Sequence, residues 1–335
     1  LNQAAYEALG LGGVMDFTAN DAEKVALLNS VLDKKSAIVS DIETWTQLEG
    51  LAKTVKSVID TAAGRTADPE LTDVNLQSLG VADVTDDNLD AVIAALSAAV
   101  ASEVDELNDI NTLVTSTAGH FDTALTKIRN YAGDDSTAVD NSGGVPALVD
   151  YQALGIDFTA LSDDAALVDS VNTVLASLPV EGTDVDAAAK VKAIVEAYDA
   201  IRTANNDGTL NLDQAGYEVL GLGDAVDFGN DGAAKLALLN SVLDTKSAAT
   251  GDVDEWDELE GLAATVAGVI DTAAGRSADP DLTAENLNAL GVTGVDPDNL
   301  DAVVADLAEK ATTDVDSLSD LSGVVAAAVQ AHGDA

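Results

Sequence analysis

The chain contains no cysteine among its 335 residues. Disulfide bonds and thiol chemistry are therefore excluded. No stretch approaches the ~18 uninterrupted apolar residues of a membrane-spanning helix, so no membrane insertion is expected. Aromatic residues make up only 3% of the chain and proline occurs five times. Few runs of β-branched residues alternate with a period of two, and this pattern argues against a β-sandwich.

Basic residues are also scarce, since 15 lysines and arginines stand against 60 acidic residues, for a formal net charge of -45. Such a surface repels nucleic acid and anionic lipid, so neither is expected as a partner. The charge favours solubility and mutual repulsion; attraction of divalent cations and adaptation to salty water are the alternatives. Hydrophobic residues make up 47% of the chain, mostly Ala, Val and Leu, whose small side chains suit closely approaching helices.

Two stretches of the chain, 6–96 and 217–307, are near copies that align without a gap at a constant offset of 211 positions. Leu-Leu-Asn-Ser-Val-Leu-Asp occurs once in each copy, and so does Val-Ile-Asp-Thr-Ala-Ala-Gly-Arg. Repetition at a fixed spacing is typical of tandem arrays. Leu1 falls inside the pattern, at the position of Leu212, and we therefore expect the chain to be a segment of a longer protein.

Each unit of the array is predicted to contain three helices. In the first unit, the expected helices cover residues 2–9 and 22–35, followed by a third whose start is indicated by the capping-box spacing of Ser40 and Glu43. Gly10 is predicted to end the first helix in a left-handed conformation. The third helix has the clearest apolar stripe, with spacings of three or four: Ile42, Trp45, Leu48, Ala52, Val55, Ile59 and Ala62.

The predicted fold class is all-α, a tandem array of ~70-residue three-helix bundles that forms an extended rod. A bundle of this size has one small core and is only marginally stable alone, so packing end to end adds buried apolar surface. The predicted units are 1–68, 69–145, 146–209, 210–279 as a copy of 1–68, and 280–335 as a truncated copy of 69–124.

Five aromatic residues are predicted to have structural roles. Tyr6, Tyr151 and Tyr217 precede Leu-Gly by the same spacing and are interpreted as residues of a unit core or a unit junction. Trp45 and Trp256 belong to the stripe of the third helix and are predicted to pack in the core. No nucleophile and base occur in a recognisable arrangement, so the chain is not expected to be an enzyme.

Calcium is the one ligand that the sequence favours. Asn205, Asp207 and Asn211 match positions three, five and nine of an EF-hand-like loop, where oxygen ligands are expected. Thr203 stands at position one and Gln214 at position twelve, where a charged bidentate ligand is usual. The alternative interpretation is a solvated turn. No other cofactor is expected.

The segment 79–96 and its twin 290–307 contain Leu-Gly-Val followed by Asn-Leu-Asp-Ala-Val. This motif resembles repeats in giant acidic surface proteins of bacteria, which are repeat-built adhesins and filament-like extensions. Those proteins are typically poor in cysteine and are often exported by type I secretion. The resemblance covers essentially all units and implies an extracellular stalk or filament segment, without catalytic residues to carry over.

Together these observations predict a structural, non-catalytic spacer or stalk of an extracellular bacterial adhesin or surface filament. The expected partners are neighbouring repeats of the same chain, and assembly into a homo-oligomer or filament is left open. One alternative is a host-protein-binding surface module, which requires an exposed apolar patch on corresponding helix faces. The other alternative is a calcium-stabilised component of a surface layer.

Overall fold

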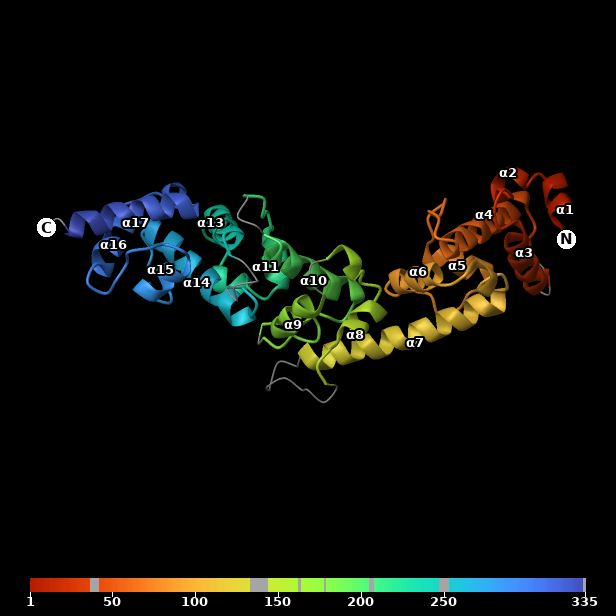
Figure 1. Cartoon of the computed structure of the whole chain (residues 1–335), viewed down its shortest axis with the longest axis horizontal. Helices are drawn as coiled ribbons and strands as arrows, with labels where there is room; N and C mark the ends of the chain where they lie inside the picture. Colours follow the sequence, from red (N-terminus) through yellow and green to blue (C-terminus); the bar gives the residue numbers. More distant parts are fainter. Residues whose placement is uncertain are drawn as a thin grey trace. The chain divides into compact units, whose positions relative to one another are not determined.

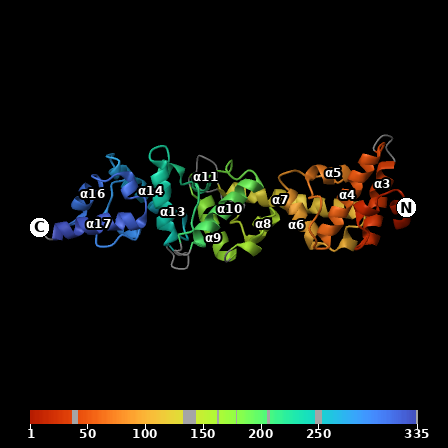
Figure 2. The ribbon, with the colours of Figure 1, turned by 90° about the horizontal axis from the view of Figure 1, so that it is seen from above.

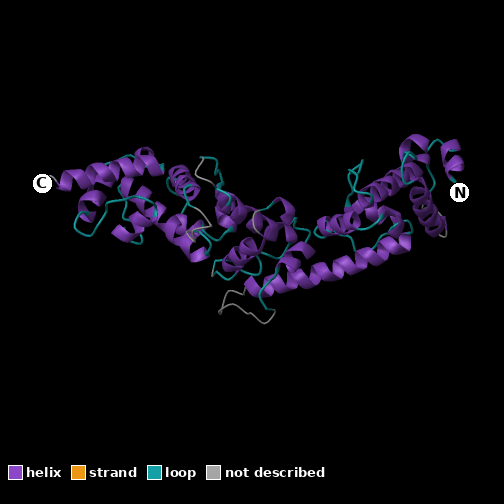
Figure 3. Ribbon diagram, viewed as in Figure 1, coloured by secondary structure: helices purple, strands orange, loops and turns teal. Residues whose placement is uncertain are grey.

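A computed structural model describes residues 1–36, 42–132, 144–161, 164–177, 179–204, 208–246 and 253–333. Over these residues the chain forms helices and no strand, as Figure 3 shows, so the all-α prediction is confirmed. Two compact units are present: Leu1–Lys127 together with Ala147–Asp157, and Ile128–Pro146 together with Phe158–Ala335. None of the described helices is both long enough and apolar enough to cross a membrane.

The first unit is built around one long central helix, α4. Its helices follow the order α1 (Gln3–Ala8), α2 (Gly12–Met15), α3 (Asp21–Ser36), α4 (Trp45–Ala62), α5 (Asp73–Leu79), α6 (Leu89–Ala98), the 3-10 turn η1 (Ala101–Glu103), α7 (Leu107–Ala132, whose residues from Ile128 onwards belong to the second unit) and α8 (Leu148–Ala153). The central helix packs against α2, α3, α5 and α6. In both views α3, α4 and α5 lie side by side (Figure 1, Figure 2).

The second unit repeats this arrangement around α14 and adds α9 and α10. Its elements are η3 (Phe158–Ala160), α9 (Asp164–Leu175), α10 (Ala188–Arg202), α11 (Gln214–Val219), α12 (Gly223–Val226), α13 (Gly232–Asp244), α14 (Trp256–Ala273), α15 (Ala284–Ala289), α16 (Leu300–Leu307), η5 (Thr312–Asp314) and α17 (Leu318–Gly333). Each of the helices α11 to α17 begins 211 positions after its counterpart among α1 to α7. The sequence repeat is therefore also a repeat of helix starts.

Short polar side chains set these starts. The side-chain oxygens of Asn2, Thr44 and Thr72 each accept a backbone N–H from three residues further along, which satisfies a group that the helix leaves open. The predicted cap Ser40 lies outside the described residues. The capping box of α4 is formed instead by Thr44 and Gln47, so this helix begins at Trp45.

Between the first two expected helices lies a one-turn helix, α2. Asp16 closes it in the left-handed region, with a φ of 48°, and Asp227 closes its counterpart α12 with a φ of 47°. Aspartate tolerates this conformation better than most residues because its short polar side chain can bond locally. Here the Asp16 carboxylate accepts the hydroxyl of Thr18 at 2.7 Å.

One cluster of buried apolar side chains runs from Tyr6 to Val114 in the first unit. The stripe predicted for the central helix is buried from Ala52 onwards, together with Leu51 and Val58. The core crosses the boundary expected at 68/69, because α4 packs against both α5 and α6. Each fully buried aliphatic side chain contributes ~1.5–3 kcal/mol, so this shared core couples helices on both sides of that position.

The Ile59→Ala substitution is expected to lower the free energy of unfolding of the first unit by ~2–5 kcal/mol, because it leaves a cavity at a fully buried position of α4. Urea unfolding should be followed by tryptophan fluorescence in a Trp256→Phe background, where Trp45 is the only tryptophan. Thr46→Ala, at the exposed second position of the same helix, is the control. Equal midpoints for the two variants would contradict the assigned core.

Candidate functional site

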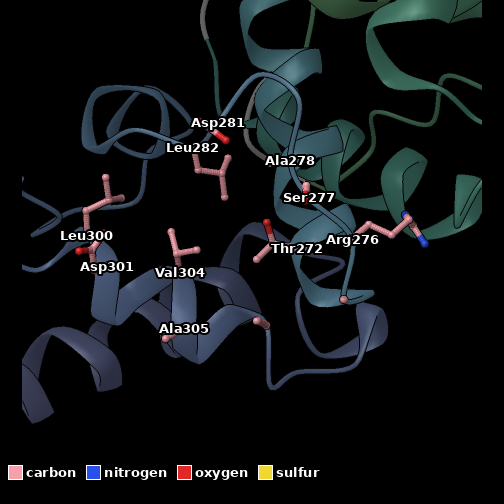
Figure 4. Close-up of a pocket in the computed structure, with 12 residues that line it drawn as sticks. Thr272, Arg276, Ser277, Ala278, Asp281, Leu282, Leu300, Asp301, Val304 and Ala305 are labelled. Carbon is pink, nitrogen blue, oxygen red and sulfur yellow. The ribbon is translucent and has the colours of Figure 1, made fainter.

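One cleft of the second unit lies between the C-terminal end of α14, the turn that follows it, and α16, and has a volume of about 690 Å³. Figure 4 shows Leu282 and Val304 facing this cleft, whereas the guanidinium of Arg276 points away from them. Arg276 is already paired with Asp271 at 2.6 Å and Asp231 at 2.7 Å. The cleft therefore offers an apolar wall and no free cation from Arg276.

The most distinctive polar site of the first unit is a buried ion-pair cluster made by Lys24, Asp60, Lys56, Arg65 and Asn20. The side chain of Lys24 is 1% exposed. Its amine donates to the backbone carbonyl oxygen of Asp16, which closes α2, at a distance of 2.8 Å. The same amine lies 3.5 Å from a carboxylate oxygen of Asp60. Asp60 also accepts from Lys56 at 2.7 Å and from Arg65 at 2.6 Å. Arg65 extends to Asn20, at the start of α3, at 2.8 Å.

This geometry decides the charge state of Asp60. Burial acts to raise the pKa of the carboxyl group, but hydrogen bonds from Lys56 and Arg65 and the charge of Lys24 act against it and prevail. The pKa of Asp60 therefore lies below its ordinary value. The cluster joins the C-terminal ends of α2 and α4 to α3. The lowered pKa keeps the carboxylate of Asp60 ionised at neutral pH. A catalytic carboxyl would instead need a pKa close to the working pH.

The second unit contains this cluster at equivalent positions, except that Ala267 stands in the place of Lys56. Lys235 is fully buried, donates to the carbonyl oxygen of Asp227 at 3.0 Å and lies 3.1 Å from Asp271. Arg276 takes the place of Arg65, and Asp231 replaces Asn20 as its second partner. A buried amine that recurs with the same partners is a feature of the repeat rather than of one site.

The repeated motif Leu-Leu-Asn-Ser-Val-Leu-Asp is explained by three polar side chains on α13. Asn240 accepts the backbone N–H of Leu212 at 3.1 Å, Ser241 accepts that of Leu318 at 3.0 Å, and Asp244 accepts that of Gly208 at 2.8 Å. In the first unit, the hydroxyl of Ser30 likewise accepts the N–H of Leu107 at 3.0 Å.

All three predicted tyrosines are fully buried. The hydroxyl of Tyr6 donates to Asn29 at 2.7 Å, and that of Tyr217 donates to Asn240 at 2.8 Å. Burial raises the pKa of both phenols, so they stay protonated and serve as hydrogen-bond donors. Tyr151 is buried on α8 in the first unit.

The two tryptophans differ in their surroundings, although their positions in the repeat are equivalent. Trp256 is 6% exposed and donates its indole N–H to the carbonyl oxygen of Leu220 at 2.7 Å. Trp45, which we expected in the core, is 46% exposed. The local sequence is the same pattern in both copies, so the difference comes from what lies against the helix.

The residues of the expected calcium loop are only partly described. Asn205 and Asp207 lie outside the described residues, and Asn211 is exposed. The described part of the loop is held by the carboxylate of Asp244, which accepts the N–H groups of Gly208 and Leu210. Across the described ranges, no group of three or more His, Cys, Asp or Glu side chains is placed to hold a metal ion.

No protein-family description, no curated protein and no solved structure matches the chain. The functional argument therefore depends on the internal repeat and on the contacts described above.

Replacing Asp60 with Asn should destabilise the first unit by ~3–5 kcal/mol at neutral pH, because Lys24 would remain buried without its counter-charge. Because the folded pKa of Asp60 is depressed, its contribution is present above the unfolded pKa of ~3.9 and is lost as the pH falls through the folded value. The stability gap between the parent chain and the variant should therefore shrink below about pH 4.

The measurement is urea unfolding from pH 7 to pH 3, read by Trp45 fluorescence in a Trp256→Phe background. Glu70→Gln removes an equal charge at an exposed position and is the control. A gap for Asp60→Asn that stays constant over this range would show that the carboxylate is not the group that the cluster requires in its ionised form.

Proposed function

We propose that the chain is a structural, non-catalytic segment of an extracellular bacterial adhesin or surface filament, in which helical units joined end to end hold distance. The observation that carries this proposal is the repetition of whole helices, caps and a buried ion-pair cluster at one constant offset. A binding or catalytic site needs to be built once, whereas a spacer gains length each time a unit is copied.

The buried contacts support a role that depends on shape. In the first unit, Lys24 and Asp60 fix the relative positions of three helices, and the same pair recurs as Lys235 and Asp271. Hydrogen bonds of this kind require a defined geometry, so each unit resists sliding of its helices. Such units suit a stalk, which must keep its dimensions without a bound ligand.

The charge of the chain supports an extended arrangement. A net charge of -45 on 335 residues makes distant parts repel one another. In the proposed arrangement, three-helix units of ~70 residues follow one another as a rod, each packed on its neighbours. The resemblance of segment 79–96 to repeats of bacterial surface proteins supports the extracellular location.

Small-angle X-ray scattering of the chain should give a radius of gyration well above the ~20 Å of a compact globule of this length. The reason is that end-to-end packing adds length in one direction. The value should persist in 1 M salt, where charges are screened beyond ~3 Å, because salt removes the repulsion but leaves the end-to-end packing of the units in place. A concentration series separates elongation from association. A radius near that of a globule at low concentration would contradict the proposal.

A further inference from the structure

The first unit carries an exposed apolar surface whose counterpart in the second unit is buried. We define the end surface as Leu9, Ile42, Trp45 and Leu48, at the junction of α1 and α4. Leu9 is 49% exposed and Trp45 46%, while Ile42 and Leu48 are half-buried. At the counterpart, all four residues are 6% exposed or less: Leu220, Val253, Trp256 and Leu259.

The counterpart is covered by α9, α10 and the loop between them. The backbone N–H of Trp256 donates to the hydroxyl of Thr173 on α9 at 2.9 Å, and the hydroxyl of Tyr198 on α10 donates to the carbonyl oxygen of Val253 at 2.8 Å. In the connecting loop, Val180 lies so close to Gly221 that a Cβ there would be 3.2 Å from its Cγ2. Figure 1 shows α9, α10 and α11 together within the second unit.

The helices that carry the end surface are arranged like those of the covered counterpart in the second unit. Helices α1, α2 and α4 begin at the positions that correspond to α11, α12 and α14, and α2 packs against α4 as α12 packs against α14. The hydrogen bond from the buried tyrosine is also the same: Tyr6 donates to α3 at 2.7 Å, and Tyr217 donates to α13 at 2.8 Å. The two copies therefore differ in what lies on the surface and not in how it is built.

The orientation of the Trp45 ring is the one expected when no other segment covers the end surface. A Cβ on Gly10 would lie 3.5 Å from Cη2 of Trp45, so the indole ring rests over this glycine. At the counterpart, residues 179–180 lie against Gly221 instead, and the indole of Trp256 donates to a carbonyl oxygen. Docking would therefore turn the ring of Trp45 from Gly10 to the carbonyl oxygen of Leu9, the position that corresponds to Leu220.

We propose that the end surface is the docking site for a helical unit of the same kind as residues 158–204, bound as α9 and α10 are bound to α11 and α14. The partner would present a threonine hydroxyl to the N–H of Trp45 and a tyrosine hydroxyl to the carbonyl oxygen of Ile42. An apolar loop would cover Gly10. The proposal deepens the proposed function, since it specifies the contact through which repeats join.

The test uses the full chain with a second copy of residues 145–211 joined directly before Leu1, the register that the 211-residue offset sets. The background is Trp256→Phe, so that Trp45 is the only tryptophan. The expected result is a shift of the emission maximum to shorter wavelength and a several-fold fall in acrylamide quenching relative to the chain without the added copy. A buried tryptophan with its indole N–H bonded has these properties.

The matched control is the same extended chain with Val180→Asp in the added copy only, which places a charge against Gly10 and should restore the exposed signal. Circular dichroism checks that the added helices still form. Unchanged emission in the extended chain would overturn the proposal, and so would protection that survives Val180→Asp. Protection of Trp45 in the unextended chain that fades on dilution would show that another molecule covers the surface, and would overturn it too.

These outcomes are independent of the scattering result. A compact particle in which Trp45 becomes protected would contradict the spacer function and leave the docking site in place. An elongated particle in which Trp45 stays exposed would do the reverse.

Discussion

The structure depends on burying one lysine amine per repeat. Lys24 and Lys235 are 1% and 0% exposed, and a charge removed from water in this way is tolerated only with a carboxylate and a hydrogen-bond acceptor at hand. Asp60 and Asp271 supply the carboxylate, and a left-handed aspartate supplies the carbonyl oxygen. Because the three groups come from different helices, satisfying the lysine fixes how those helices meet. The short helices α2 and α12 gain their positions from this requirement.

The same principle extends to the ends of the elements. A core rich in alanine and valine offers little shape to distinguish one helix register from another, because small side chains interlock weakly. Directional bonds supply the missing specificity: Asn240 and Asp244 accept backbone N–H groups of the segment before α11, and Ser241 accepts that of Leu318 at the start of α17. This explains why polar residues interrupt the apolar pattern of α13, and why they recur at the same places in α3. Within the described residues, Arg202 Nε is the buried side-chain nitrogen left without a partner.

The buried ion pairs and the polar side chains of α13 bond to other groups of the same repeat unit. In the part of the chain that the structure describes, buried side-chain donors and acceptors other than Arg202 Nε have partners without a ligand. In the first unit, apolar side chains around Trp45 are exposed where their counterparts in the second unit are buried. In the function proposed above, such a chain would extend by adding units, because a neighbouring repeat would cover the surface around Trp45 as α9 and α10 cover its counterpart in the second unit.

The sequence by itself determined the features that depend on near neighbours. Helix periodicity predicted the all-α class and the stripe from Ala52 to Ala62, and the constant offset predicted the matched helix starts, because capping and amphipathic patterns are local. It did not determine that Thr44 rather than Ser40 forms the capping box, since both residues have the required spacing. Nor did it signal the burial of Lys24, whose partner Asp60 is distant in the chain. Only the tertiary structure separated Trp45 from Trp256, because burial depends on which distant helices cover a position, and the same local pattern is covered in one copy and open in the other.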